Sequence, residues 1–253
     1  MKKIIFAALL TALLLGVGRA QEKAWSQWTK IEAEKILNSS PWGHTQTETD
    51  TSEMMYSPTS QAGIGSSTRT GVLGTTSDRQ SVNNNRAAQG ANNQAISVNY
   101  HVRLLSAKPV RQAFMRVIEL AQKSPDKELI EGLQSFVERD FKDFIVVAVS
   151  FDSTDGRYSG PALQAFASGT LGTLKNRTYL ERKDGKRLFL MEYHAPINDG
   201  LGAKFIFPRI VDEKKFLNVD SGSLRFYSEV SNQIKLNVTF KVSEMMYNGQ
   251  LEY

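Results

Sequence analysis

Three aspartates lie where predicted strands end, and they are the first candidates for chemistry in this chain. Asp152 and Asp155 follow the apolar run 144–149, a predicted central strand, and Asp199 lies in the turn before another predicted strand. Loops of this kind often carry function, and carboxylates that met there could hold a hard cation or act as an acid/base pair. Aspartate is also common in turns for backbone reasons alone. A calcium loop starting at Asp152 is excluded, because Leu163 stands at the twelfth position, where that loop needs an acid.

A histidine and a lysine near Asp199 add to the candidates. His194 ends a predicted strand, and Lys204 follows a glycine-rich turn. The turn has the composition of a phosphate loop, but the lysine of such a loop is followed by a helix, and residues 205–207 are strand-like. The other histidines have no metal-ligand spacing with each other or with His194, so we predict no metal site.

No catalytic signature accompanies these residues. The chain contains no cysteine, which excludes thiol nucleophiles, thiolate metal sites and disulfide bonds. No serine stands in a Gly-x-Ser-x-Gly sequence, the usual setting of a hydrolase nucleophile. We therefore predict no catalytic residue, no metal and no cofactor. The candidate binding residues are Asp152, Asp155, His194, Asp199 and Lys204.

Residues 1–20 have the pattern of a secretory signal peptide. Lys2 and Lys3 come first, an apolar run covers residues 4–15, and Ala20 stands before the expected cleavage at Gln21. The apolar run is too short for a transmembrane helix. We therefore expect an exported protein, periplasmic or secreted, with no integral membrane segment after signal cleavage.

The charge balance gives no reason to expect a nucleic-acid partner. The formal charge of the whole chain is +5, and removing the three basic residues of the predicted signal lowers it to +2. No cluster of lysines and arginines marks a basic surface. The expected partner is a protein or a surface outside the cytoplasm.

The mature chain divides into three predicted parts. Residues 21–44 contain an amphipathic helix over Trp25–Leu37, and all three tryptophans lie in this part. The indoles form either an aromatic platform for a ligand or, as we expect, a contact with the core, because aromatic burial is strongly stabilising. Residues 45–95 are a polar, low-complexity insertion with too few apolar residues to offset the entropy of ordering, so we expect disorder. Residues 96–253 form the core domain.

Strict alternation of apolar and polar residues predicts the strands of the core. The clearest hairpin pairs residues 224–230 with 234–242, and a second pairs 174–182 with 186–193 around an Asp-Gly turn. A strand over 96–104 precedes two predicted helices, which we expect to cover the apolar face of the sheet. This order favours an α+β fold: a mostly antiparallel sheet of about six strands with two to three helices packed on one face.

Three short stretches resemble a known group of sequences. They are Trp25-x-x-Trp28 leading into Ser40-Pro41-Trp42, the run Ser-Ala-Lys-Pro-Val-Arg at 106–111, and the run Asp-Gly-Leu-Gly-Ala-Lys-Phe at 199–205. Together they resemble a family of hypothetical exported bacterial proteins for which no activity is known. The resemblance covers nearly all of the mature chain except residues 45–94. It implies export and a single domain, and it implies no activity, ligand or site residue.

The function that these observations favour is non-enzymatic binding of a partner or a surface outside the cytoplasm. One alternative is a hydrolase that uses strand-end carboxylates. Another is a carrier of an apolar small molecule within a curved sheet. The phenylalanines predicted to line such a carrier pocket are Phe189, Phe205, Phe207 and Phe226.

Overall fold

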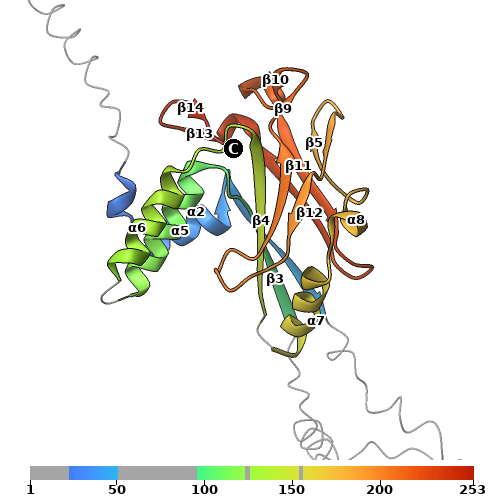
Figure 1. Cartoon of the computed structure of the whole chain (residues 1–253), viewed down its shortest axis with the longest axis horizontal. Coiled ribbons are helices and arrows are strands. Elements are labelled where there is room, and N and C mark those ends of the chain that lie inside the picture. The colour runs from blue at the N-terminus through green and yellow to red at the C-terminus, as the bar shows by residue number, and fades with distance from the viewer. Residues whose placement is uncertain (1–22, 51–95, 123–125, 154–155) are drawn as a thin grey trace, which may run out of the picture.

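The computed structural model describes residues 23–50, 96–122, 126–153 and 156–253 (Figure 1). The predicted signal peptide, residues 51–95 of the predicted insertion and Asp155 lie outside the described residues. The helices are η1 (Trp25–Gln27), α2 (Lys30–Asn38), α5 (Lys108–Ala121), α6 (Lys127–Glu138), α7 (Gly156–Ala167), α8 (Leu171–Leu174), η2 (Val219–Ser221) and η3 (Val242–Glu244). No helix within these ranges is long and apolar enough to cross a membrane.

The strands form two main sheets. Sheet A contains β1 (Ser39–Ser40), β2 (Gly43–Asp50), β3 (Ile96–Leu104), β4 (Phe144–Ser153), β8 (Ala203–Pro208) and β7 (Glu192–His194), in that spatial order. Sheet B contains β12 (Lys235–Lys241), β11 (Ser223–Glu229), β5 (Thr178–Arg182) and β6 (Arg187–Phe189). Two short hairpins complete the described strands: β9 (Ile210–Val211) with β10 (Lys214–Lys215), and β13 (Met246–Tyr247) with β14 (Gln250–Leu251).

Sheet A is the middle of three layers. Figure 1 shows α2, α5 and α6 on one side of it and the strands of sheet B on the other. On the helix side, the Arg103 guanidinium of β3 donates from Nε to the carbonyl oxygen of Leu37 in α2, at 3.0 Å. On the other side, the rings of Phe205 in β8 and Phe226 in β11 pack edge to face at 5.4 Å. The predicted α+β fold, with a mostly antiparallel six-stranded sheet, is confirmed.

The hairpin of β11 and β12 belongs to sheet B, so the prediction that helices cover its apolar face was wrong. The alternation itself is confirmed, because every second residue of β12 is buried: Leu236, Val238 and Phe240 point inward. These side chains pack against sheet A. Alternation shows that one face of a strand is dry and does not show which layer covers that face.

Three of the four phenylalanines expected to line a carrier pocket are instead buried in the core. Phe205, Phe207 and Phe226 have no exposed surface, and their rings contact one another. Phe189 lies at the edge of sheet B, half exposed. The space between the two sheets is thus filled by aromatic side chains, as expected for a close-packed interior.

The N-terminal part begins with two short helices in place of the single predicted one. Thr29 ends the first segment by capping α2: its hydroxyl accepts from the Glu32 N–H, and the Glu32 carboxylate accepts from the Thr29 N–H. The hydrogen bond from Lys23 and those from Thr29 lower the pKa of Glu32 to about 2. Along α2, Ala33 and Leu37 are buried, whereas Ile31 is exposed.

The polar insertion begins later than predicted, because Thr45 to Asp50 belong to β2. Each threonine of β2 pairs with a polar residue of β3, so the outer face of these two strands is polar. The inner face is held by the Gln46 side chain, which accepts from the Asn237 N–H and donates to the Lys235 carbonyl of β12, at 2.8 and 2.7 Å. The sequence did not predict this strand, because it contains few apolar residues and its pairing depends on hydrogen bonds.

The second predicted hairpin is shorter than expected and leads back to sheet A. β5 and β6 pair around Gly185, whose φ of +84° is the positive value that an Asp-Gly turn needs. β6 ends at Phe189, and the chain then crosses to the edge of sheet A as β7. This crossing places His194 beside Lys204, its partner in the neighbouring strand.

Candidate functional site

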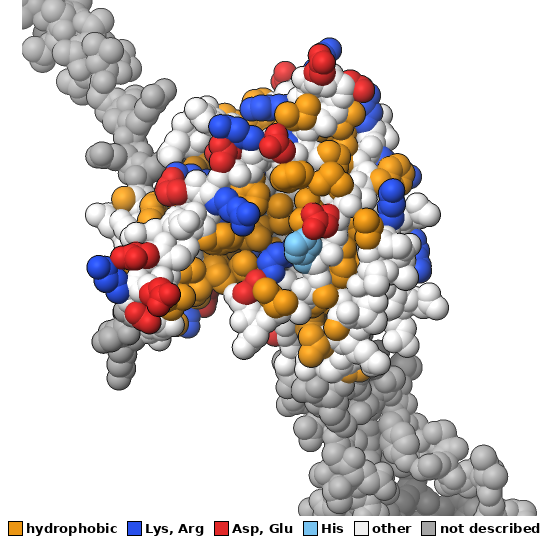
Figure 2. All heavy atoms as spheres, in the orientation of Figure 1, with side chains coloured by type: hydrophobic (Ala, Val, Ile, Leu, Met, Phe, Trp, Pro, Cys, Tyr) orange, Lys and Arg blue, Asp and Glu red, His pale blue; other side chains and the backbone are white. Residues whose placement is uncertain are grey.

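An open groove lies between the end of α6 and the outer face of sheet A, and we call it the helix–sheet groove. Its volume is about 380 Å³. Its apolar lining residues are Leu105, Phe136, Phe141, Phe144, Val146, Leu201 and Ile206. Its charged or titratable lining residues are Arg139, Asp140, Glu192, His194 and Lys204. Figure 2 shows hydrophobic side chains gathered in the hollow between the helices and the sheet, with charged groups along its border.

The register of sheet A explains the floor of this groove. Val146 of β4, Ile206 of β8 and Glu192 of β7 stand opposite one another in a row across the sheet. Residues two positions apart share a face, so Phe144 also points outward on this side. The prediction that residues 144–149 are covered on both sides holds for Ile145 to Val149, which are buried, whereas Phe144 is 40% exposed.

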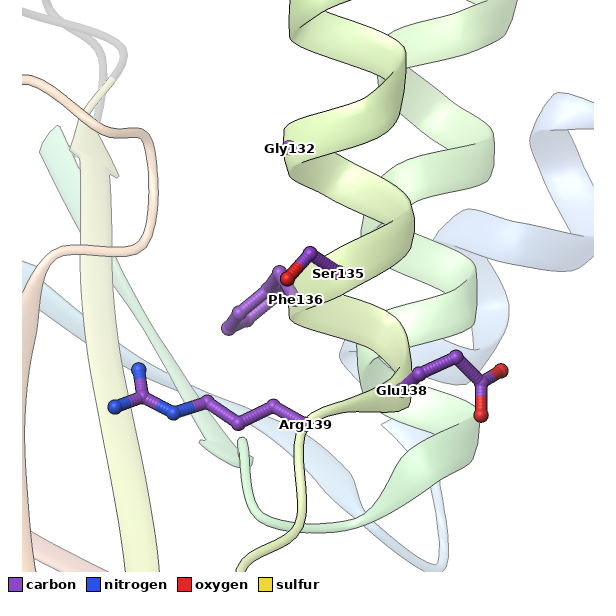
Figure 3. A pocket seen from close by; sticks show the side chains of 5 residues that line it. All are labelled: Gly132, Ser135, Phe136, Glu138 and Arg139. Carbon is purple, nitrogen blue, oxygen red and sulfur yellow. The ribbon is translucent and has the colours of Figure 1, made fainter.

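The wall of the groove comes from α6, where sequence analysis named no site residue. Figure 3 shows Phe136 and Arg139 extending from α6 toward the strands, whereas Glu138 points the other way. A shallow depression beside Gly132 and Ser135 continues the groove along the helix and shares Phe136 and Arg139 with it. The apolar face of α6 was visible in the sequence. The sequence could not show that part of this apolar face lies away from the sheet, because that depends on how the helix packs in the tertiary structure.

Two of the five predicted binding residues, His194 and Lys204, line the groove, and a third, Asp199, pairs with Lys204. Lys204 Nζ lies 2.7 Å from the Asp199 carboxylate, and the same carboxylate accepts from the Leu201 N–H. His194 Nε2 lies 2.7 Å from the carboxylate of Glu192. The positive φ of Gly200 and Gly202 lets the chain turn sharply enough to bring Asp199 back to Lys204.

The fourth predicted residue, Asp152, belongs to a separate polar network on the same face of sheet A. Its carboxylate lies 2.6 Å from His101 Nε2 and accepts from the Asn99 amide at 2.9 Å. The other ring nitrogen of His101, Nδ1, lies 2.9 Å from the Thr45 hydroxyl. The bond with His101, followed by that with Asn99, lowers the pKa of Asp152 below its ordinary value. Asp155, the fifth, lies outside the described residues.

A second groove, which we call the aromatic groove, has a volume of about 580 Å³ and contains all three tryptophans. Trp28 and Trp42 are buried, and the Trp42 indole donates to the Glu252 carbonyl at 2.8 Å. These two indoles therefore dock on the core as expected, while Trp25 is partly exposed. The rest of the apolar lining consists of Ala24, Ile36, Met246 and Tyr247.

The side chains within the described ranges form no group of three or more His, Asp or Glu that could hold a metal ion. The acids of the two networks are also separate: Asp199 pairs with Lys204, and Asp152 pairs with His101. Comparison of the chain with family models, with curated proteins and with solved structures finds no match. The geometry of the site is therefore the basis for a functional proposal.

Proposed function

We propose that this chain is an exported, non-enzymatic binding protein that takes up a small apolar ligand in the helix–sheet groove. The observation that carries the proposal is an open groove of about 380 Å³ with seven apolar lining residues, beside a core that is already filled. Ligand sites of proteins are mostly apolar concavities of roughly 300–1,000 Å³ with a few polar groups that orient the ligand. Export is part of the proposal and rests on the sequence pattern of residues 1–20.

The exposure of Phe144 supports this use of the groove. A large aromatic side chain on a central strand is normally covered, and covering it stabilises a protein or a complex by roughly 25 cal/mol for each Å² removed from water. Phe144 stands at the start of β4 and lines the groove together with Phe141 and with Val146 of the floor. A ligand in the groove would complete that cover.

A hydrolase is the second candidate, and the chain of contacts from Thr45 through His101 to Asp152 favours it. A histidine between a hydroxyl and a carboxylate can accept the hydroxyl proton and so create a nucleophile. Thr45, His101 and Asp152 lie on the exposed face of sheet A, and they line neither the helix–sheet groove nor the aromatic groove. Because neither of the two grooves surrounds the threonine, the helix–sheet groove offers a ligand more contact than this network does, so binding is the better supported function.

A binding measurement with a neutral apolar dye tests the proposal. N-phenyl-1-naphthylamine, which brightens in apolar surroundings, should bind the protein with saturation. Phe144→Ser should weaken this binding about five- to tenfold, because the variant loses an apolar contact worth roughly 1–1.5 kcal/mol. Phe189→Ser is the matched control: Phe189 is also partly exposed on a strand, and it does not line the groove.

The control variant should bind the dye as the parent protein does. Thermal unfolding of both variants separates a local loss of contact from a loss of fold. The proposal fails if the folded parent protein binds no dye, or if both variants lower the affinity equally.

A further inference from the structure

Building on the proposed function, we infer that the natural ligand of the helix–sheet groove is an anionic amphiphile, with an apolar chain that ends in a single carboxylate held by Arg139. The apolar lining accounts for the chain of such a molecule. The charged side chains around the groove account for its head group, and they are not equivalent to one another.

Two of the charged side chains that line the groove are neutralised by a neighbour. Lys204 pairs with Asp199, at 2.7 Å. Asp140 pairs with Lys142, at 2.8 Å. These two pairs leave no net charge for a ligand to meet.

Arg139 is the exception on the wall of the groove. Its guanidinium forms no salt bridge and no hydrogen bond with any residue that the structure describes, and it lies 5.8 Å from the centre of the Phe141 ring. Figure 3 shows this side chain extending from the end of α6 toward the sheet. An arginine fork matches a carboxylate with two parallel hydrogen bonds, and such charged bonds are stronger than neutral ones.

Glu192 fixes the direction in which an anion would lie. It stands across the groove on β7, and among the described residues its carboxylate contacts only His194, at 2.7 Å. Its negative charge repels a carboxylate at the β7 edge, so the head group belongs at the α6 wall and the chain over Val146 and Ile206. The same repulsion disfavours a second anionic group at the far end of the ligand.

Displacement of the neutral dye by three ligands of equal chain length tests this inference. Decanoate should displace the dye at a concentration about three- to tenfold lower than 1-decanol or decylammonium. Arg139→Gln should abolish the preference for decanoate over 1-decanol. Arg139→Glu should reverse the preference in favour of decylammonium.

Arg177→Gln is the matched control, because Arg177 is exposed and also lacks a carboxylate partner among the described residues. This variant should keep the full preference for decanoate. Equal displacement by decanoate and 1-decanol, unchanged in Arg139→Gln, would overturn the anionic head group and leave the proposed apolar site intact. A preference for decanoate that survives in Arg139→Gln would overturn the role of Arg139. Failure of the dye itself to bind would overturn the proposed function.

Discussion

Arg111→Met should lower the free energy of unfolding by about 3–5 kcal/mol, because it removes the donor that serves four backbone carbonyl oxygens. Arg111 lies in α5, is 4% exposed, and donates to the carbonyl oxygens of Val137 and Arg139 at 3.2 and 3.1 Å. Its guanidinium also bonds the Leu105 and Ser106 carbonyls before α5. The carbonyls of Val137 and Arg139 end α6, where a helix has no internal donor left for them.

The loss comes from stranded acceptors and not from charge alone. Burial lowers the pKa of Arg111 to about 10, so the guanidinium is still charged at neutral pH. Methionine keeps much of the side-chain volume and donates no hydrogen bond. A buried acceptor without a partner costs about 1–3 kcal/mol.

Urea unfolding monitored by circular dichroism measures this effect. Arg177→Met is the control, because Arg177 is exposed and makes one bond to the Thr173 carbonyl. It should change the stability by less than about 1 kcal/mol. Equal losses in the two variants would show that Arg111 does not join α6 to the rest of the fold.

Phe240→Ala should also cost about 3–5 kcal/mol, because it removes a large buried ring from the space between the two sheets. Phe240 has no exposed surface, stands opposite Leu224 in the ladder of sheet B, and lies 5.0 Å from the ring of His44 in β2. The cavity left behind would reach from sheet B to sheet A. With a total stability of about 5–15 kcal/mol for a domain, this loss is severe.

Thr239→Ala is the matched control in the same strand. Thr239 points to solvent, so the change should stay within about 1 kcal/mol, the span of strand preferences. Guanidinium titrations of the two variants give the comparison. A larger loss for Thr239→Ala would mean that the inward face of β12 has been assigned to the wrong set of residues.

Local patterns predicted the strands best where alternation is strict or where a turn has a strong signature. The alternation in β12 gave its buried face, and Asp184-Gly185 gave the turn between β5 and β6. The same patterns could not distinguish one sheet from two, because an apolar face looks alike whether a helix or another sheet covers it. The same patterns did not predict β2, because its outward residues are threonines and its inward residue Gln46 forms hydrogen bonds with backbone groups of the other sheet.

The candidate site was predicted in part. Asp199, His194 and Lys204 lie close in the sequence around one strand crossing; in the structure His194 and Lys204 line the groove, and Asp199 pairs with Lys204. Phe136 and Arg139 could not be placed there from the sequence, because they come from α6, far along the chain, and their role depends on how that helix packs. Asp152 was chosen for its turn, whereas its partners His101 and Asn99 come from the neighbouring strand β3.

The most direct test of the account is a methyl NMR titration of the protein with decanoate. Val146, Leu201 and Ile206 line the helix–sheet groove, so their methyl signals should shift progressively with added decanoate and then saturate. The indole N–H signals of Trp25, Trp28 and Trp42 report on the aromatic groove in the same sample, and they should stay in place. Shifts confined to the indole signals, or no shifts in either groove, would contradict the claim that the helix–sheet groove binds the ligand.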